Sequence, residues 1–228
     1  MTHTVKEEIA YLKNFVTDYK NDLFARLIEE RTGYVTMVLE DLYQPHNCSA
    51  VLRSCDCFGI QNVHIIENAN TFKDNSEISM GASDWLTIHR HKGKGKNHTG
   101  ETIDELKARG FRVVATTPHE RDTFIDDIDL HRGKMAFFMG TELTGLSDEV
   151  LTRADEFVKV PMYGFTESYN VSVCAALLMY SVVQRLRRSD IDWHLAGEER
   201  DEVLLKWYKR SIKASAEILE RFNQENNQ

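Results

Sequence analysis

The sequence lacks the segments that mark a membrane or secreted protein. No stretch reaches the ~18 consecutive apolar residues that cross a bilayer, and its first residues, MTHTVKEEIAYLKN, contain no apolar signal core. Only four cysteines occur among 228 residues, which fits a reducing compartment. Fixed-period repeats and low-complexity tracts are also missing. We therefore expect a cytoplasmic protein with one sizeable core domain and terminal extensions.

Short apolar runs alternate with helical patterns through the middle of the chain. This alternation predicts a mostly parallel α/β sheet. Strands are expected at residues 34–39, 62–66, 86–89, 111–116, 135–139 and 157–160. At each end of the chain, apolar residues recur at three- and four-residue spacing, from Val5 to Leu27 and from Leu204 to Phe222. This spacing predicts one helix with an apolar face at each end, and such a face most often covers a core or a subunit partner.

The segment from Leu39 to Ile60, LEDLYQPHNCSAVLRSCDCFGI, carries polar residues that folding does not need. It follows a predicted strand, and ligands of open α/β sheets bind at the carboxyl ends of strands. The pattern is helical from Asn47, and Gly59 is a natural stop. Asn47 lies near the start of this helix and Arg53 about two turns further on. The plain alternatives are that Asn47 caps the helix and that Arg53 is a solvated surface residue.

A second unusual segment, MGTELTGLSDEVLTRADEFVKVPMYGFTESYNVSV, runs from Met139 to Val173. Gly140 and Gly145 lie in its first loop, where glycine permits close approach of the backbone to a ligand. Ser168 and Asn170 lie at the start of a long apolar helix, which we expect to begin at Ser168 and which offers donors to a polar or anionic ligand. Ordinary capping is the alternative. Ser168 makes a poor covalent nucleophile because no histidine lies near it in sequence and no G-x-S-x-G elbow surrounds it.

Three of the four cysteines, Cys48, Cys55 and Cys57, are close together in the sequence. Such a cluster can indicate a metal site or a disulfide. On a helix, however, C-x-C directs its two side chains away from each other. We therefore expect small buried thiols and no metal.

Together, the two unusual segments resemble the SpoU (TrmH-like) family of SPOUT methyltransferases, which transfer a methyl group from S-adenosylmethionine to a ribose 2′-hydroxyl of RNA. The first family motif has an Asn and, six residues later, an Arg, matched by Asn47 and Arg53. The second has a glycine, a glutamate and another glycine, matched by Gly140, Glu142 and Gly145. The third, (I/V)PM-G-x-x-x-S-x-NVS, is matched by Val160, Pro161, Met162, Gly164, Ser168, Asn170, Val171 and Ser172.

The resemblance covers roughly residues 34–188, and these combined motifs are far more specific than a lone glycine loop. Within the family, they are most similar to the tRNA 2′-O-methyltransferases that act on a D-loop guanosine. The resemblance implies an α/β SPOUT fold with a deep trefoil knot in its C-terminal part. The expected organisation is a helical extension at 1–31, the SPOUT domain at 32–190 and a second helical extension at 191–228.

The resemblance also implies a homodimer as the active unit and a bent S-adenosylmethionine held largely through backbone groups. We map the cofactor site to Thr116, Gly140, Val160, Met162 and Ser168. This is not a Rossmann site, and the absence of G-x-G-x-x-G agrees with that. A knot is rare enough that composition and periodicity could not have predicted it.

The implied reaction is an in-line attack of a ribose oxygen on a sulfonium methyl group, so the protein must align two atoms and manage a hydroxyl proton. The family assigns the main role to Arg53, sometimes as a base. Because arginine stays protonated in proteins, our hypothesis is that Arg53 grips the adjoining phosphate, and that this phosphate or water takes the proton. The resemblance implies that Asn47 orients Arg53 or the ribose and that Glu142 fixes the cofactor loop or the arginine. Asn170 and Ser168 would complete the pocket.

The net charge of −8 is the main objection to an RNA substrate, because acidic proteins repel phosphates at long range. Positive charge is nevertheless concentrated in one segment. Residues 89–98, HRHKGKGKNH, include no acidic residue and contain Arg90, Lys92, Lys94 and Lys96. We interpret it as a loop that binds RNA phosphates rather than a merely solvated loop. Arg185 and Arg188 near the end of the long helix either bind RNA or pair with the helix C-terminus. RNA contact by the polar faces of the terminal helices is a secondary possibility.

Two other functions stay open on the sequence. One is the same chemistry on ribosomal RNA. The other is a non-catalytic RNA-binding or assembly protein of the same fold. All the matching polar positions are filled, which favours an active enzyme.

Overall fold

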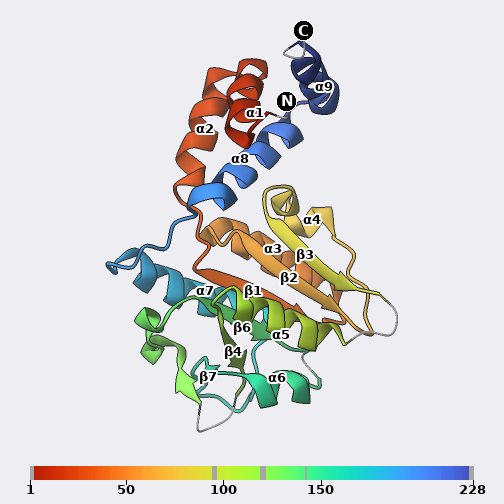
Figure 1. Ribbon diagram of the computed structural model, residues 1–228. Coiled ribbons are helices and arrows are strands. Elements are labelled where there is room, and N and C mark those ends of the chain that lie inside the picture. Colours follow the sequence, from red (N-terminus) through yellow and green to blue (C-terminus); the bar gives the residue numbers. More distant parts are fainter. Residues whose placement is uncertain (1–2, 94–96, 119–121, 142, 226–228) are drawn as a thin grey trace. The chain divides into compact units, whose positions relative to one another are not determined.

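The computed structural model describes residues 3–93, 97–118, 122–141 and 143–225 (Figure 1). The chain forms two compact units. Residues Thr32–Trp193 make up the larger unit, and Met1–Arg31 together with His194–Gln228 make up the smaller one. In the part of the chain that is described, no helix has both the length and the apolar character needed to cross a membrane.

The larger unit is built on a seven-stranded sheet in which the recorded strand pairs are parallel. The strand order is β3-β2-β1-β6-β4-β7-β5. The strands are β1 (Val35–Glu40), β2 (Asn62–Glu67), β3 (Thr87–Lys92), β4 (Arg112–Thr116), β5 (Thr123–Phe124), β6 (Met135–Met139) and β7 (Glu156–Lys159). At the centre, Leu39 of β1 lies opposite Ile65 of β2 and Met139 of β6. The predicted α/β fold with a mostly parallel sheet is confirmed.

Helices cover both faces of this sheet (Figure 1). On one face, α3 (Pro45–Phe58) and α7 (Val171–Arg187) pack on inward residues such as Leu39 and Phe137. On the other face, α5 (His98–Ala108) and α6 (Asp148–Arg153) pack on Val38 and Phe138. Neighbouring strand residues thus enter opposite cores, as the alternation of a strand requires. The short α4 (Ser76–Ser79) lies in the connection between β2 and β3. Burial on both faces explains the continuous apolar runs of the sequence.

The smaller unit contains α1 (Val5–Leu12), α2 (Asp18–Ile28), α8 (Gly197–Ser211) and α9 (Ser215–Glu225). Its core includes Phe24, whose ring centroid lies 5.6 Å from that of Trp207 and 5.2 Å from that of Tyr208. The expectation of one helix at each end was wrong, because each end forms two. At the N-terminal end, a 3-10 turn follows α1, and the Thr17 side chain accepts a hydrogen bond from the Lys20 N–H to start a new helix.

Candidate active site

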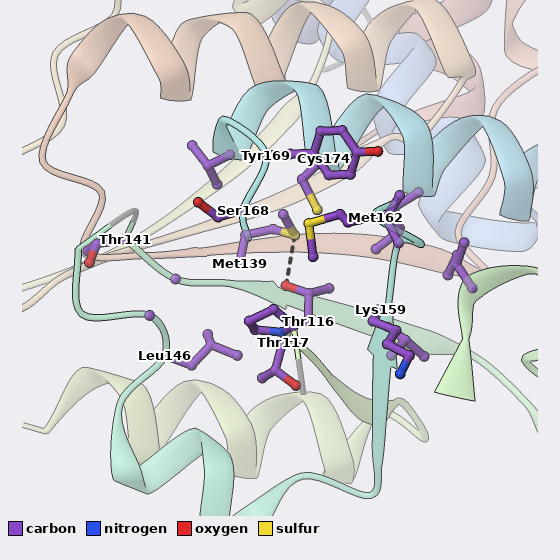
Figure 2. Close-up of a pocket in the computed structure, with 18 of the residues that line it drawn as sticks. Thr116, Thr117, Met139, Thr141, Leu146, Lys159, Met162, Ser168, Tyr169 and Cys174 are labelled. Atoms are coloured by element: carbon purple, nitrogen blue, oxygen red, sulfur yellow. Dashed lines mark hydrogen bonds between the residues drawn. The ribbon is translucent and has the colours of Figure 1, made fainter. Parts of the chain in front are cut away.

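A pocket of about 390 Å³ opens at the carboxyl ends of β4, β6 and β7 (Figure 2). It also takes in residues at the start of α7, among them Val171 and Cys174. The five residues that the sequence analysis assigned to the cofactor all line it: Thr116, Gly140, Val160, Met162 and Ser168. The Thr116 hydroxyl donates to the carbonyl of Phe138 at 2.7 Å and contacts Met139 Sδ at 3.1 Å, which ties the ends of β4 and β6 together. The structure therefore gathers the second and third motifs around one cavity.

One wall of the pocket is the loop between β6 and α6, residues 140–147, hereafter the glycine loop. Thr141 and Gly145 pair with each other through two backbone hydrogen bonds of 3.0 Å. Gly145 has a φ of +69°, a conformation that favours glycine. A Cβ atom on Gly140 would lie 2.2 Å from the carbonyl of Gly145 and 2.4 Å from the N of Leu146. Only glycine lets the loop fold back this closely on the end of β6.

The first and third motifs meet through Asn47 and Asn170, which are 123 residues apart in sequence. The Asn170 side-chain amide donates to Asn47 Oδ1 at 3.1 Å, and Asn47 donates in turn to Gln44 Oε1 at 3.2 Å. Asn47 is buried and does not cap α3, because the helix begins earlier, at Pro45. Capping does apply to Asn170, whose Oδ1 accepts from the Ser172 N–H at 2.9 Å. The prediction that the long helix begins at Ser168 was wrong, since α7 begins at Val171.

The other proposed catalytic residues are Ser168, Arg53 and Glu142. Ser168 is exposed at the pocket. Arg53 lies on the exposed side of α3 and has no recorded hydrogen bond or ion pair to any described residue. Glu142 lies outside the described residues. The structure thus brings Asn47 and Asn170 together, places Ser168 at the pocket, and leaves the guanidinium of Arg53 open to solvent.

The basic segment at 89–98 is only partly a loop, because β3 continues to Lys92 and α5 begins at His98. The guanidinium of Arg90 donates to both carboxylate oxygens of Glu67, at 2.8 and 2.7 Å, and to the carbonyl of Phe72 at 3.0 Å. Burial opposes ionisation of Glu67, but the hydrogen bonds from Arg90 and the Phe72 N–H hold its pKa below the ordinary value. Arg90 therefore braces the connection after β2. Lys92 is exposed, whereas Lys94 and Lys96 lie outside the described residues.

The two arginines near the end of α7 differ in their surroundings. Arg185 is half-buried and donates to the carbonyls of Ile125, at 2.9 Å, and Ile128, at 2.5 Å. It holds the turn after β5 against the helix. Arg188 is exposed and follows the last residue of α7. Of the two, Arg188 has the guanidinium more open to a partner.

All four cysteines are free thiols, and the prediction that the clustered ones are buried is wrong for one of them. Cys48 and Cys55 are buried, as expected, but Cys57 is exposed. Cys174, which the cluster did not include, lines the pocket, and burial raises the pKa of its thiol to about 11. It is therefore protonated at neutral pH. Within the described ranges, no group of three or more His, Cys, Asp or Glu side chains is arranged to hold a metal ion.

Sequence reasoning missed a histidine cluster on β2 and β3, away from the pocket, in which His64 is buried and His89 and His91 are half-buried. His64 Nδ1 lies 2.9 Å from His91 Nε2, and the ring of His64 stacks on that of His89 with centroids 4.4 Å apart. Burial, together with the neighbouring histidines, lowers the pKa of His64 to about 2. His64 is therefore neutral at any ordinary pH. Strand periodicity could have found this cluster, since His89 and His91 are two residues apart on one face.

A parallel sheet with a pocket at its strand ends, lined by these motifs, is the arrangement expected of a SPOUT methyltransferase. The family model described as the SpoU rRNA Methylase family matches residues 34–180. The chain belongs to this family.

Relatives and solved structures agree with that assignment. The chain is 40% identical over 213 residues to a tRNA (guanosine(18)-2′-O)-methyltransferase of Borreliella burgdorferi, covering 93% of this chain and 95% of the relative. The crystal structure of the A. aeolicus TrmH/SpoU tRNA modifying enzyme matches with a TM-score of 0.73 and 26% identity, covering 86% of this chain and 98% of that one. The SpoU methyltransferase AviRb from Streptomyces viridochromogenes, solved in complex with AdoMet, shares the fold at a TM-score of 0.61 and 24% identity, covering 71% and 64% of the two chains.

Proposed function

We propose that this protein transfers a methyl group from S-adenosylmethionine to the ribose 2′-hydroxyl of a D-loop guanosine in tRNA. The observation that carries the proposal is that residues of the second and third motifs, which follow two different strands, line one pocket at the strand ends. The names of the relatives support the substrate. An enzyme that acts on tRNA works where tRNA is used, so we extend the proposal to a cytoplasmic location.

The residues present fit the proposed cofactor. The pocket has about 390 Å³ for a nucleoside with an amino-acid tail, and its walls are mainly apolar, including Leu146, Val158 and Leu178. Apolar walls with a few polar groups are what a small-molecule site requires. The missing Cβ of Gly140 leaves backbone groups accessible at the end of β6. We assign Thr116, Gly140, Val160, Met162 and Ser168 to cofactor binding, and the bound cofactor supplies the sulfonium methyl group.

The protein's own part in the reaction is alignment. The Asn47–Asn170 hydrogen bond holds the starts of α3 and α7 together, so the exposed Asn170 can orient the ribose and the buried Asn47 can do so through Asn170. Arg53 presents a planar guanidinium fork that matches a phosphate. In this mechanism Arg53 grips the phosphate next to the target ribose, and that phosphate or water accepts the hydroxyl proton. Glu142 retains its proposed role of fixing the glycine loop or Arg53.

We also propose that the active unit is a homodimer and that the chain path contains the family's trefoil knot. Exposed apolar side chains on α7 support the dimer. Val173, Leu177 and Tyr180 lie at three- and four-residue spacing and are 48%, 40% and 60% exposed, so they form one stripe along the helix. A second copy would remove this apolar stripe from water, which is the usual driving force for association.

The test is methyl transfer from labelled S-adenosylmethionine to unmodified tRNA and, separately, to ribosomal RNA, followed by nucleoside digestion. We expect 2′-O-methylguanosine in tRNA alone. Label found only in ribosomal RNA would support the proposed reaction but show that the substrate is ribosomal RNA and not tRNA. No label in either RNA, despite measured cofactor binding, would overturn the proposed substrate and favour a non-catalytic RNA-binding role.

A further inference from the structure

The carboxylate of Glu40, the last residue of β1, is 4% exposed and has no part in the mechanism described above. It accepts three hydrogen bonds. The Ser147 N–H donates to Oε2 at 2.9 Å, the Ser147 hydroxyl donates to Oε1 at 2.6 Å, and the Thr99 hydroxyl donates to Oε1 at 2.7 Å. Glu40 therefore joins the end of β1 to the starts of two different helices, α5 and α6.

Ser147 matters because it is the last residue of the glycine loop and the N-cap of α6. The other end of this loop follows β6 directly, so the sheet already fixes it. Between the two ends, the Thr141–Gly145 pairing makes the loop a short closed hairpin. The position of the Ser147 end relative to the sheet then depends on the contacts that Ser147 makes. Two of the three hydrogen bonds to Glu40 come from Ser147 and hold this end in place.

The part of the glycine loop held in this way faces the pocket. Gly140, Thr141, Gly145 and Leu146 all line it, and Leu146 is adjacent in sequence to Ser147. A shift of Ser147 would carry Leu146 with it and change the shape of the cofactor pocket. A charged carboxylate suits this task, because hydrogen bonds to charged acceptors are stronger than neutral ones and because helix starts favour negative charge.

We propose that Glu40 is a positioning residue for cofactor binding, which acts by holding the Ser147 end of the glycine loop against the sheet. The inference rests on the proposed function, because it takes S-adenosylmethionine as the ligand of the pocket. It assigns Glu40 no contact with the cofactor or the RNA.

The chain offers a matched pair of substitutions on the same carboxylate. Ser147→Ala removes the hydroxyl bond to Glu40 on the loop side, together with the bond that this hydroxyl accepts from the Val150 N–H. Thr99→Val removes the hydroxyl bond to Glu40 on the α5 side, together with the bond that this hydroxyl accepts from the Asn68 side-chain amide. Glu40→Gln keeps the size of the side chain but replaces one acceptor oxygen by an NH2 donor, which then faces either the Ser147 N–H or the two hydroxyl groups. We expect Glu40→Gln to raise the Kd for S-adenosylmethionine about tenfold, as one lost charge-assisted hydrogen bond would. Ser147→Ala should raise it severalfold, and Thr99→Val should leave it within about twofold.

The readouts are the cofactor Kd by calorimetry, the KM for each substrate, kcat, and the Tm of each variant. A positioning role predicts a higher cofactor KM in Glu40→Gln, with kcat at saturating cofactor and the KM for RNA near wild type. A purely structural role predicts that Glu40→Gln and Thr99→Val lower the Tm alike and change the Kd alike, and this result would overturn the proposal. If Glu40→Gln does not fold, an equal Kd in Ser147→Ala and Thr99→Val would overturn it instead. Failure of the wild-type protein to bind S-adenosylmethionine would refute the proposed function itself.

Discussion

Replacing Gly140 by alanine should damage the pocket far more than the addition of one methyl group suggests. The new Cβ would lie 2.2 Å from the carbonyl carbon and oxygen of Gly145, whereas unbonded carbon atoms prefer about 3.5–4.0 Å. The glycine loop would therefore have to move by more than about 1 Å. The obstructing atoms are backbone, so no side-chain rotation relieves the clash. Overpacking of this kind costs about 1–3 kcal/mol of folding free energy.

The functional loss should be larger than the loss of stability, because the displaced loop is a wall of the pocket. A misplacement of about 1 Å can reduce turnover about 100-fold. We expect Gly140→Ala to bind S-adenosylmethionine weakly, to lose methyl transfer at fixed cofactor concentration, and to melt several degrees lower. Calorimetric titration of the cofactor, a methyl-transfer assay and a thermal melt measure the three effects.

Gly164→Ala is the matched control for stability. Gly164 lies in the sequence between two pocket residues, Met162 and Ser168, but the nearest atom to a Cβ added at Gly164 is Thr166 N, at 4.0 Å. Its free energy of unfolding should change by less than about 0.5 kcal/mol. If Gly140→Ala retained wild-type Tm and wild-type cofactor affinity, the close approach of the glycine loop to β6 would not be needed, and the reasoning would be refuted.

Further predictions concern the residues around the pocket and the histidine cluster. Asn47→Ala and Asn170→Ala should each lower kcat, and the double variant should lose less than the sum because the two share one hydrogen bond; additive losses would contradict this. Arg53→Lys should lower turnover and leave the Tm unchanged, because the exposed guanidinium of Arg53 has no recorded hydrogen bond or ion pair to another described residue. Near-normal turnover would count against bidentate binding of a phosphate by Arg53. The pKa of His64 is about 2 in the folded protein against 6.5 ordinarily, so below pH 6.5 only the unfolded chain gains its proton. Stability should then fall by about 1.6 kcal/mol from pH 6.5 to pH 5, and His64→Gln should flatten that dependence in thermal melts.

Much of the fold could be predicted because buried parallel strands leave a strong pattern. The strand expected at 135–139 is β6, and four of the other five expected strands begin and end within one residue of those observed. The exception is β3, expected to end at residue 89, which continues to Lys92. Its later residues His89, Arg90 and His91 are polar, so the apolar pattern stops although the ladder with β2 continues. β5 was missed because two residues carry no periodicity.

The candidate site, like the fold, could be predicted from the sequence only in part. The five cofactor positions line the pocket because their motifs fall at the ends of strong strands, where a parallel sheet collects them. Side-chain partners were beyond the sequence. Nothing in a run of basic residues predicts that Arg90 is committed to Glu67, 23 residues away. The hydrogen bonds that Ser147 donates to Glu40 join residues 107 apart, and only the folded chain brings them into contact.

The Asn47–Asn170 contact also constrains the order in which the protein can fold. β1 pairs with β6, about a hundred residues later in the chain, and α7 must then return to the start of α3. Structures dominated by such distant contacts fold slowly, because the entropy of closing long loops is lost before the contacts form. On the ribosome, a nascent chain that ends before α7 contains the first two motifs and most of the third but lacks the α7 residues that line the pocket. Cofactor binding during refolding should therefore appear in the last kinetic phase, after the secondary structure of the sheet.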